Sequence, residues 1–387
     1  MSPVRATARG AQRTSLDGER ADVVVCGASF AGLATARALA GSGLDVLVVD
    51  RYEIGERATS ACATPEGWLH ALGLQDAIRQ VLPDMTFTTP HGSVRYRLPW
   101  RWAAFDYRAL CEALWAQCDG ARFETAKVEG RSPTGVRTDR GVLHAPRVVD
   151  ALGWKRVLGV HQQPPDAPNS RGLEVHPHVG EPDATALDCW VDRSLVRRGY
   201  AWRVPAGDEQ RVGVGSYDPR RHVKDPTLDL ARRLDVPAER FQGNWFAHRL
   251  RTATDGRTAF VGDSAGHCFP LSGEGIRTAF HFGAALGEAI RDEPSWEAAL
   301  RRYARFHAAH RHAFELAWQL QRLVPALPPR VLTAGLRAFA PFQRRAFAWY
   351  LRQAPPPGKR GRALLPTGRR GRALLPVVGR SARPRFP

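Results

Sequence analysis

Two short apolar runs flank a helical stretch near the start of the chain. Residues 21–26 read ADVVVC and residues 46–49 read VLVV, and both runs suit strands that are buried on both faces of a parallel sheet. Between them, small and apolar residues recur with helical spacing until Gly41 and Gly43, where the helix is expected to end. The order of these elements predicts a strand–turn–helix–strand unit.

The turn of this unit has the composition of a dinucleotide-binding loop. Gly27, Ser29 and Gly32 occupy the three positions of a G-x-G-x-x-G pattern, with serine in place of the second glycine. Asp50 follows the second strand, 23 residues after Gly27. At this spacing, amides at the helix N-terminus bind a pyrophosphate, and the acid accepts hydrogen bonds from the adenosine ribose. An ordinary βαβ unit with a tight turn is the alternative.

The rest of the pattern predicts an α/β fold. Helical spacing over 67–80 and 107–114, then short alternating strands over 121–150, extend the first unit. Strands separated by Pro, Gly and Asp turns follow from about 173 to 250, and 258–262 reads again as a buried strand. We predict these parts: a disordered leader (1–20), a three-layer Rossmann-like dinucleotide-binding domain (21–160 and 251–296), an inserted antiparallel β-sheet substrate domain (161–250), a helical C-terminal region (297–353) divided by Pro341, and a basic disordered tail (354–387).

The positive charge is concentrated at the C-terminal end. Residues 297–387 carry 19 of the 56 Lys and Arg residues but only two of the 38 acids, so the preceding part is nearly neutral. No base-reading motif accompanies the basic segment, which argues against a specific nucleic-acid function. The six scattered cysteines include no C-x-x-C pair, which favours reduced thiols in a cytoplasmic protein over disulfides or a metal site. We expect no secretory signal and no membrane-spanning helix.

A second cluster, VGDSAGHCFPLSGEGI over 261–276, points to a flavin. Asp263 follows a predicted strand, at the sheet edge where doubly wound folds bind ligands, and its carboxylate suits the hydroxyls of a ribityl chain. Pro270, Gly273 and Gly275 allow a backbone to pass close to a flat ring. A helix that begins near Ile276 would direct its N-terminal amides at the electron-rich end of a reduced flavin.

Together these motifs resemble the FAD-dependent oxidoreductases of the p-hydroxybenzoate hydroxylase type, and within them the geranylgeranyl reductase family. Three further segments carry the resemblance over residues 21–350: GYAWRVP at 199–205 is similar to that family's Y-x-W-x-F-P motif, RYEIG at 51–55 with Cys62 is similar to its cysteine segment, and DALGW at 150–154 is similar to its middle D-[AG]-x-G segment. The chain departs from the family at Val204, Arg197 and Ala63. These departures bear on the substrate and leave the flavin assignment intact.

The resemblance implies roles for individual residues. Arg51 and Arg108 would contact FAD, Arg108 near its linker. Tyr200 and Trp202 lie at strand spacing, so both project to one face and would line an apolar isoprenoid cavity. Cys62 would lie beside the flavin, where its thiol acts as the proton donor that hydride addition to an unactivated alkene requires. A small buried residue that fills space is the alternative for Cys62, and core packing is the alternative for both aromatics.

The function that the resemblance implies is FAD-dependent reduction of carbon–carbon double bonds in a polyisoprenoid lipid of the geranylgeranyl type or a prenylated quinone. NADPH and a reduced carrier are both open as electron donors. A flavin-dependent monooxygenase that acts on an apolar or aromatic substrate and a non-catalytic, membrane-associated FAD-binding protein are the alternatives. The GYAWRVP segment is also similar to the W-x-W-x-I-P motif of flavin-dependent halogenases. Those enzymes need a lysine early in the chain, and the first lysine here is Lys127, so a halogenase ranks low. The apolar, arginine-bordered C-terminal helices predict attachment to an anionic membrane surface, which makes the protein peripheral to the inner face of the membrane.

Overall fold

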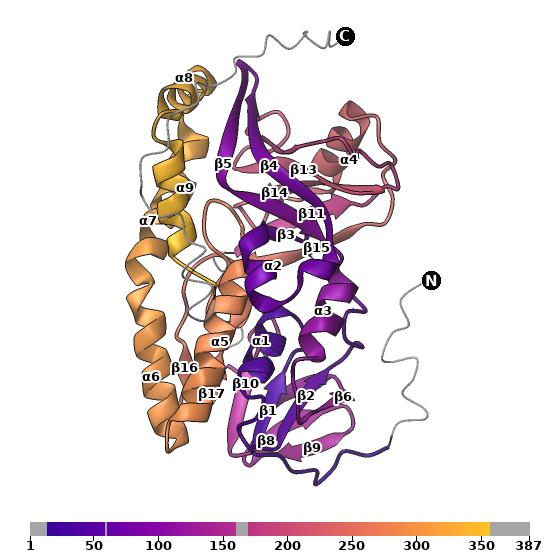
Figure 1. Cartoon of the computed structure of the whole chain (residues 1–387), viewed down its shortest axis with the longest axis vertical. Helices are drawn as coiled ribbons and strands as arrows, with labels where there is room; N and C mark the ends of the chain where they lie inside the picture. The colour runs from indigo at the N-terminus through magenta and orange to yellow at the C-terminus, as the bar shows by residue number, and fades with distance from the viewer. Residues whose placement is uncertain (1–13, 59, 160–168, 357–387) are drawn as a thin grey trace.

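A largely parallel sheet with helices on one side forms the nucleotide-binding half of the protein (Figure 1). The computed structural model describes residues 14–58, 60–159 and 169–356. The six strands of this sheet are in the order β16-β17-β10-β1-β2-β6, and only β16, at one edge, is antiparallel. Their bounds are Val23–Cys26 for β1, Val46–Asp50 for β2, Ala121–Thr125 for β6, Arg147–Asp150 for β10, Thr254–Asp255 for β16 and Thr258–Phe260 for β17.

The sheet is buried on both faces, which explains the uninterrupted apolar runs in the sequence. Val23 and Val25 of β1 face a core that includes α1 (Phe30–Ala38) and α5 (Ile276–Asp292). Val24 and Cys26 face the opposite core, formed with the three-stranded meander β7 (Val128–Ser132), β8 (Gly135–Thr138) and β9 (Gly141–His144). These layers confirm the predicted three-layer arrangement.

Glycines in α5 let it approach α1 closely. A Cβ added at Gly283 would lie 2.7 Å from the carbonyl oxygen of Ala31, and one at Gly287 would lie 2.6 Å from that of Thr35. Side chains at either position would push the two helices apart. Because α1 follows the glycine turn and α5 follows the Asp263 segment, this contact fixes the two predicted cofactor segments relative to each other.

An eight-stranded, largely antiparallel sheet packs beside the first, in the order β15-β11-β14-β13-β12-β4-β5-β3. Five of its strands come from the predicted insertion: β11 (Asn169–Val175), β12 (Ala186–Trp190), β13 (Gly199–Ala206), β14 (Glu209–Ser216) and β15 (Gln242–Ala247). The helix α4 (Lys224–Arg233) covers part of this sheet, with Leu230 and Ala231 in its core.

Three strands of this sheet correct the predicted boundary of the substrate domain. β3 (Ala63–Pro65), β4 (Ile78–Thr89) and β5 (Gly92–Phe105) come from the stretch assigned to the nucleotide domain. The helical spacing predicted over 67–80 holds only for α2 (Glu66–Leu72) and the short turn η2 (Gln75–Ala77). The reason is tertiary: β4 pairs in parallel with β12, about 100 residues away, and buried Gln80 donates to the carbonyl oxygens of Glu181 and Ala184 at 2.9 and 2.8 Å.

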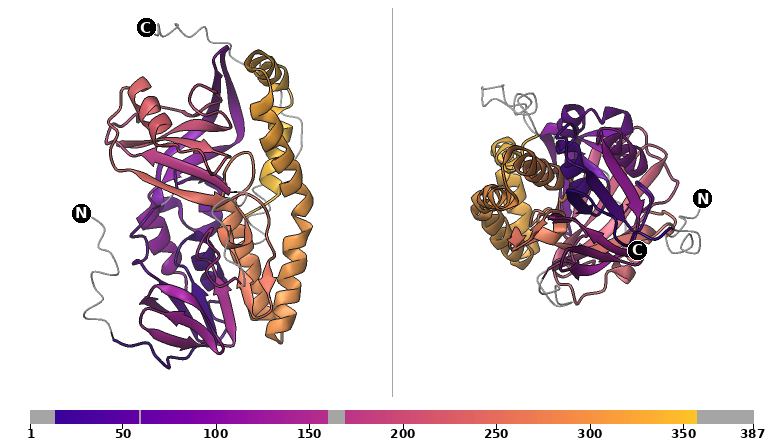
Figure 2. Two further views of the ribbon diagram at one scale, coloured as in Figure 1. Left: turned by 180° about the vertical axis from the view of Figure 1, so that it is seen from behind. Right: turned by 90° about the horizontal axis from the view of Figure 1, so that it is seen from below.

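Four helices form the C-terminal region and run along one side of the molecule (Figures 1 and 2). They are α6 (Trp296–Ala309), α7 (Arg311–Leu323), α8 (Pro329–Phe339) and α9 (Gln343–Arg352), with the turn η4 (Val324–Ala326) before α8. The predicted break at Pro341 is confirmed, because α8 ends at Phe339 and α9 begins at Gln343. The helix predicted over 107–114 is also confirmed, as α3 (Tyr107–Trp115), which follows β5. In the part that the structure describes, no helix is both long and apolar enough to cross a membrane.

The predicted leader is corrected at its end. Residues 14–20 are packed against the meander: the amide of Leu16 donates to the carbonyl oxygen of Arg140 at 2.7 Å, and that of Gly18 to Val142 at 3.0 Å. Leu16 is buried in the core below β9, so its burial orders this segment. Residues 1–13 and the basic tail from 357 onward lie outside the described residues.

Candidate flavin site

Backbone contacts require glycine at both ends of the dinucleotide turn. Gly27 has φ +111°, and a Cβ there would lie 2.4 Å from the carbonyl oxygen of Ala151. A Cβ on Gly32 would lie 1.8 Å from the carbonyl oxygen of Gly27. Ser29, in place of the middle glycine, is the N-cap of α1, and its hydroxyl is 3.1 Å from that of Tyr107. No side chain caps α1, so its first amides stay available for a pyrophosphate.

Asp50 supports this turn. Its carboxylate accepts from the amide of Ala28 at 2.8 Å and from that of Tyr52 at 3.0 Å. Burial raises the pKa of Asp50, and the two amide hydrogen bonds oppose that rise. Each carboxylate oxygen can accept a second hydrogen bond, so the arrangement is compatible with the predicted contact to the adenosine ribose.

The two predicted arginines lie on different elements that meet at Gly55. Arg51 follows Asp50; its guanidinium lies 4.8 Å from the ring centre of Tyr52, and the residue is exposed. Arg108 is exposed on α3, and a Cβ at Gly55 would lie 2.9 Å from its Cα. Exposed cations suit the negatively charged linker of a dinucleotide, so both residues remain candidates for that contact.

The carboxyl ends of β1, β10 and β17 bring the remaining acids together. Cys26 pairs with Asp150 and Asp150 pairs with Phe260, so Gly27, Asp150 and Asp263 emerge along one edge of the sheet. Asp150 is fully buried and accepts from the hydroxyl of Ser264 at 2.7 Å, which fixes the turn η3 (Gly262–Ala265). Asp263 lies in this turn, as the sequence pattern predicts.

The surroundings of Asp263 change its acidity. Burial raises the pKa of its carboxyl to about 7, against the opposing effect of the nearby cation Arg251. A neutral carboxyl at this position donates as well as accepts, and the hydroxyls of a ribityl chain satisfy both roles.

Asp263 should make the stability of the FAD-free protein depend on pH. The pKa of this carboxyl is higher in the folded protein than its ordinary value of 3.8, so the folded state binds the proton more tightly. The stabilisation is present below about pH 4 and is lost as the pH rises to about 7. Because burial also raises the pKa values of Asp50 and Asp150, Asp263→Asn should reduce, but not abolish, the slope of melting temperatures measured between pH 4 and 8. The exposed Asp119→Asn should keep it, and an unchanged slope in Asp263→Asn would contradict the assignment.

The loop before α5 touches the predicted aromatic wall. Gly273 has φ +67°, and a Cβ there would lie 2.9 Å from the Tyr200 hydroxyl, which donates to the carbonyl oxygen of Ser272. The hydroxyl of Tyr217 donates to the carbonyl oxygen of Leu271 at 2.5 Å. Pro270 is buried at the start of this loop. Tyr200 therefore contacts the predicted flavin segment through its hydroxyl, while its ring also packs against the core of the large sheet.

Gly275 fits the close approach of a ring. It is the N-cap of α5, with Ile276 the first helical residue, and no side chain caps the helix. A Cβ at Gly275 would meet protein atoms only at 3.9 Å, and its φ of −106° is available to any residue. The protein itself therefore does not require glycine here. The open space at this helix N-terminus leaves room for the flat ring that the sequence predicts.

Trp202 lies flat on the glycine-rich strand β14. A Cβ at Gly213 would lie 2.4 Å from its ring, and one at Gly215 would lie 3.1 Å away, so the V-G-V-G sequence makes room for the indole. The ring nitrogen donates to Glu174 at 3.0 Å, and the ring centre lies 5.7 Å from that of Tyr200. The two aromatics thus form one wall, with Trp202 held on the sheet.

Cys62 is buried just before β3, in the core that also contains α1 and α5, and is held by a different set of contacts. Its thiol donates to the carbonyl oxygen of Ser60 at 3.1 Å, and Arg211 of β14 donates to its carbonyl oxygen at 3.0 Å. Burial raises the pKa of the Cys62 thiol to about 12, opposed by Arg211. Within the described residues, no hydrogen bond or ring contact joins Cys62 to Tyr200 or Trp202. The backbone of Cys62 has φ +49°, which is strained for a residue with a side chain, and such strain is common at functional sites.

An ion pair that the sequence analysis missed lies behind the flavin loop. Glu274 and Arg277 are both buried and pair at 2.8 Å, and Tyr350 of α9 donates to Glu274 at 2.5 Å. Arg277 also donates to the carbonyl oxygens of Leu351 and Ala354 at 2.9 and 3.1 Å. The spacing Glu-x-x-Arg at the start of a helix was the available signal. Its partner on α9 lies about 75 residues away, so no local pattern could identify it.

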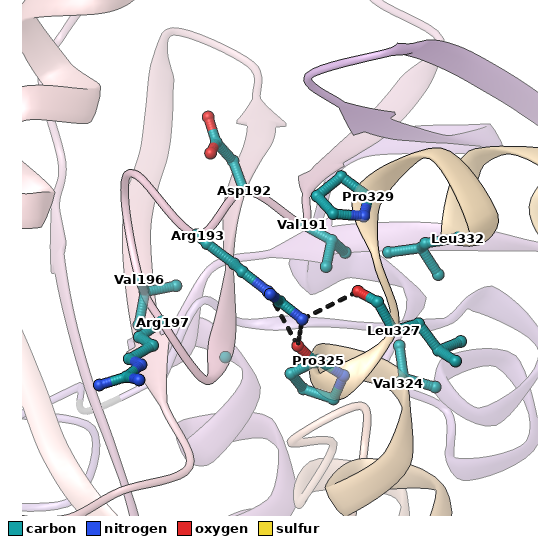
Figure 3. A pocket seen from close by; sticks show the side chains of 11 residues that line it. Val191, Asp192, Arg193, Val196, Arg197, Val324, Pro325, Leu327, Pro329 and Leu332 are labelled. Atoms are coloured by element: carbon teal, nitrogen blue, oxygen red, sulfur yellow. Dashed lines mark hydrogen bonds between the residues drawn. The ribbon is translucent and has the colours of Figure 1, made fainter.

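A small cavity between the β12–β13 connection and α8 does not belong to this site (Figure 3). Its volume is about 10 Å³, which is room for about one water molecule. Arg193 donates to the carbonyl oxygens of Pro325 and Leu327 at 2.7 and 2.9 Å, so this side chain joins η4 to the large sheet.

Comparisons with known proteins agree with the predicted resemblance. A family model for FAD dependent oxidoreductases matches residues 22–83. Digeranylgeranylglycerophospholipid reductase 1 of Methanopyrus kandleri is 26% identical over 345 residues, which cover 79% of this chain and 91% of that protein. Menaquinone reductase of Mycolicibacterium smegmatis is 26% identical over 312 residues, covering 70% and 76%.

The fold is shared with a solved geranylgeranyl bacteriochlorophyll reductase-like protein from Thermoplasma acidophilum. The TM-score is 0.72 at 18% identity, and the match covers 81% of this chain and 90% of that one. The predicted α/β architecture with its FAD-binding half is therefore confirmed. So is the similarity to geranylgeranyl reductases and the class of FAD-dependent oxidoreductase.

Proposed function

We propose that this protein reduces carbon–carbon double bonds of a polyisoprenoid chain, in a geranylgeranyl-type lipid or a prenylated quinone. The contact of Tyr200 with the loop 271–273 carries the proposal, because an aromatic wall next to the predicted flavin segment would suit an apolar chain. The curated relatives named for reduction of a digeranylgeranylglycerophospholipid and of menaquinone support a prenyl substrate.

The residues of this chain have separable roles in such a reaction. Bound FAD supplies hydride chemistry. Gly27, Gly32 and the first amides of α1 hold its pyrophosphate, and Asp263 orients its ribityl chain. Tyr200 and Trp202 exclude water and align an apolar chain. The Cys62 thiol is protonated at neutral pH, and in this proposal it gives its proton to the second alkene carbon.

An anaerobic turnover experiment tests the reaction class. The FAD-loaded protein is reduced with dithionite without oxygen and mixed with an extract of prenyl lipids, which is then analysed by mass spectrometry. We expect products that are heavier by two hydrogens for each saturated bond. Products that form only with O₂ would indicate the monooxygenase, and bound flavin without any product would indicate the non-catalytic alternative. Flavin bleaching by NADPH in the absence of dithionite separates that donor from a reduced carrier.

Replacing Cys62 should slow the reduction without releasing FAD. General acids typically contribute about 10²- to 10⁴-fold to a rate, so Cys62→Ala should reduce the single-turnover rate of product formation by a factor in that range. The flavin absorption spectrum and the FAD affinity should stay unchanged. Cys111→Ala, which removes another fully buried thiol from the same core, is the matched control and should keep most of the rate. Full activity in Cys62→Ala would identify Cys62 as a space-filling residue.

We also propose that helices α7–α9 attach the protein to the anionic inner face of a membrane. In the part that the structure describes, seven of nine exposed large apolar side chains are on these helices or, for Phe342, at the N-cap of α9: Leu316, Leu320, Leu323, Val331, Phe339, Phe342 and Trp349. Six exposed arginines accompany them (Arg322, Arg330, Arg337, Arg344, Arg345 and Arg352), and no acid follows Glu315 in the chain. Apolar side chains with a one-signed charge suit an anionic lipid surface, where a prenyl lipid also partitions.

Removing two of these apolar side chains should weaken vesicle binding. Phe342 and Trp349 are 59% and 40% exposed, and burying an aromatic side chain contributes about 1.5–3 kcal/mol. Each change to serine should therefore lower the partition coefficient for phosphatidylglycerol vesicles roughly tenfold in co-sedimentation. Phe241 is 45% exposed and directly precedes β15, outside these helices, so Phe241→Ser should leave the partition coefficient unchanged. Equal binding to phosphatidylcholine vesicles, or no effect of the α9 changes, would exclude this surface.

A further inference from the structure

A cavity of about 500 Å³ lies between residues 249–254 and the helices α6 and α7. Its lining includes Arg249, Arg251, His307, Arg311 and Trp318. The 249–251 segment is packed tightly against η3: the amide of Arg251 donates to the carbonyl oxygen of Ala265 at 3.0 Å, and a Cβ at Gly266 would lie 1.7 Å from the carbonyl oxygen of Arg249. Arg251 is also the cation near Asp263. The cavity therefore adjoins the predicted flavin site through this segment, and none of the predicted cofactor residues lines it.

The lining carries three guanidinium groups and one carboxylate, that of Glu315. Arg249 and Arg311 are exposed and form no ion pair with any carboxylate of the described residues. Arg251 donates to the carbonyl oxygen of Trp154 at 2.7 Å. Burial lowers the pKa of Arg251 to about 10, so it is still a cation at neutral pH. The net charge of the lining is therefore positive. This differs from the strands of the two sheets, where most arginines form ion pairs with acids.

The wall of the cavity is shaped by packed side chains. The guanidinium of Arg249 lies 4.1 Å from the ring centre of Trp318, and that of Arg322 lies 4.9 Å from it. His307 is only 6% exposed, and its Nε2 has no hydrogen-bond partner. Leu250, Ala304 and Phe314 add apolar surface. The cavity thus combines fixed cations and an unpartnered buried nitrogen with room for a small organic body.

We propose that this cavity binds the phosphate group of an organic phosphate. Guanidinium groups bind phosphate through paired, charge-assisted hydrogen bonds, and three of them match a group with two negative charges better than they match a single carboxylate. The volume lies within the range of small-molecule sites and exceeds what a lone phosphate fills. A nucleotide coenzyme and a phospholipid headgroup share this chemistry. The proposal is independent of the reductase activity.

Titrations of the FAD-loaded, full-length protein test the site. The three probes are inorganic pyrophosphate, NADPH with NADH as its comparison, and dihexanoyl-phosphatidylglycerol below its micelle concentration. Binding is followed by calorimetry and by the fluorescence of Trp318, with Trp318→Phe to assign the signal. The variants are Arg249→Gln, Arg311→Gln and the double variant. Arg305→Gln is the matched control, because Arg305 is exposed on α6 but outside the lining.

We expect pyrophosphate and one organic probe to bind. Each single variant should weaken binding about tenfold and the double variant about 100-fold, as the loss of charge-assisted hydrogen bonds predicts. The control should bind like the unchanged protein. Tighter binding of NADPH than of NADH identifies a nucleotide phosphate, and binding of the short-chain lipid identifies a headgroup. A protein that binds neither organic probe, or a double variant that binds as tightly as the unchanged protein, overturns the proposal.

Discussion

Gly32→Ala should abolish FAD binding and destabilise the whole nucleotide-binding half. The added methyl group would lie 1.8 Å from the carbonyl oxygen of Gly27, about half the distance of an ordinary contact. That oxygen belongs to backbone, so the turn and α1 must move apart to accept the new atom. Overpacking of this kind typically costs about 1–3 kcal/mol and occasionally more, and we expect a value at the upper end. The displaced amides of α1 would no longer converge on the pyrophosphate.

Two measurements check this result. Urea unfolding should show the loss of stability, and FAD titration should show an affinity at least about 100-fold weaker, the equivalent of roughly 2.7 kcal/mol. Gly335→Ala is the matched control: nothing lies within 4 Å of a Cβ there, and the residue is inside α8. Alanine should stabilise that helix by about 0.5–1 kcal/mol. A Gly32→Ala protein that keeps its yellow colour and its stability would show that the turn adapts.

Arg277→Met should destabilise the protein by about 3–5 kcal/mol, the usual result of removing one partner from a buried ion pair. Arg277 is fully buried, and its loss leaves the Glu274 carboxylate without its cation in a dry environment. The same change removes two hydrogen bonds to carbonyl oxygens at the end of α9, at Leu351 and Ala354. We therefore expect α9 to detach locally and the loop 271–275 to lose its support.

Hydrogen exchange of α9 and urea unfolding measure the two effects separately. The double variant Arg277→Met/Glu274→Leu should recover part of the stability, because it removes the unpaired charge as well. Arg291→Met on the same helix is the control, since its partner Asp292 is exposed and such pairs contribute about 0–1 kcal/mol. If Arg277→Met and Arg291→Met have equal effects, the buried pair does not hold the C-terminal helices in place.

These two predictions have different origins in the chain. Gly27, Gly32 and Asp50 were identified from a pattern spanning 24 residues, and Asp263, Gly275 and Ile276 from another short segment. The structure puts both segments at one sheet edge because β1, β10 and β17 pair in parallel. The close packing of α1 against Gly283 and Gly287 of α5 then fixes the two segments, and the sequence patterns do not show that these helices meet. Arg277 was not identified, although it lies next to a predicted site residue, because its partners come from α9.

The sequence by itself determined the strand–turn–helix unit, the flavin segment, the neutral body with its basic end, and the break between α8 and α9. Each of these depends on hydrophobic period, glycine geometry or charge, which act over a few residues. Only the tertiary structure decided that β3–β5 join the large sheet, that Tyr200 faces the loop before α5, and that Glu274 pairs beneath Tyr350. Those features depend on strand pairing and burial between segments up to 100 or more residues apart, and no local pattern encodes which distant partner will satisfy a buried group.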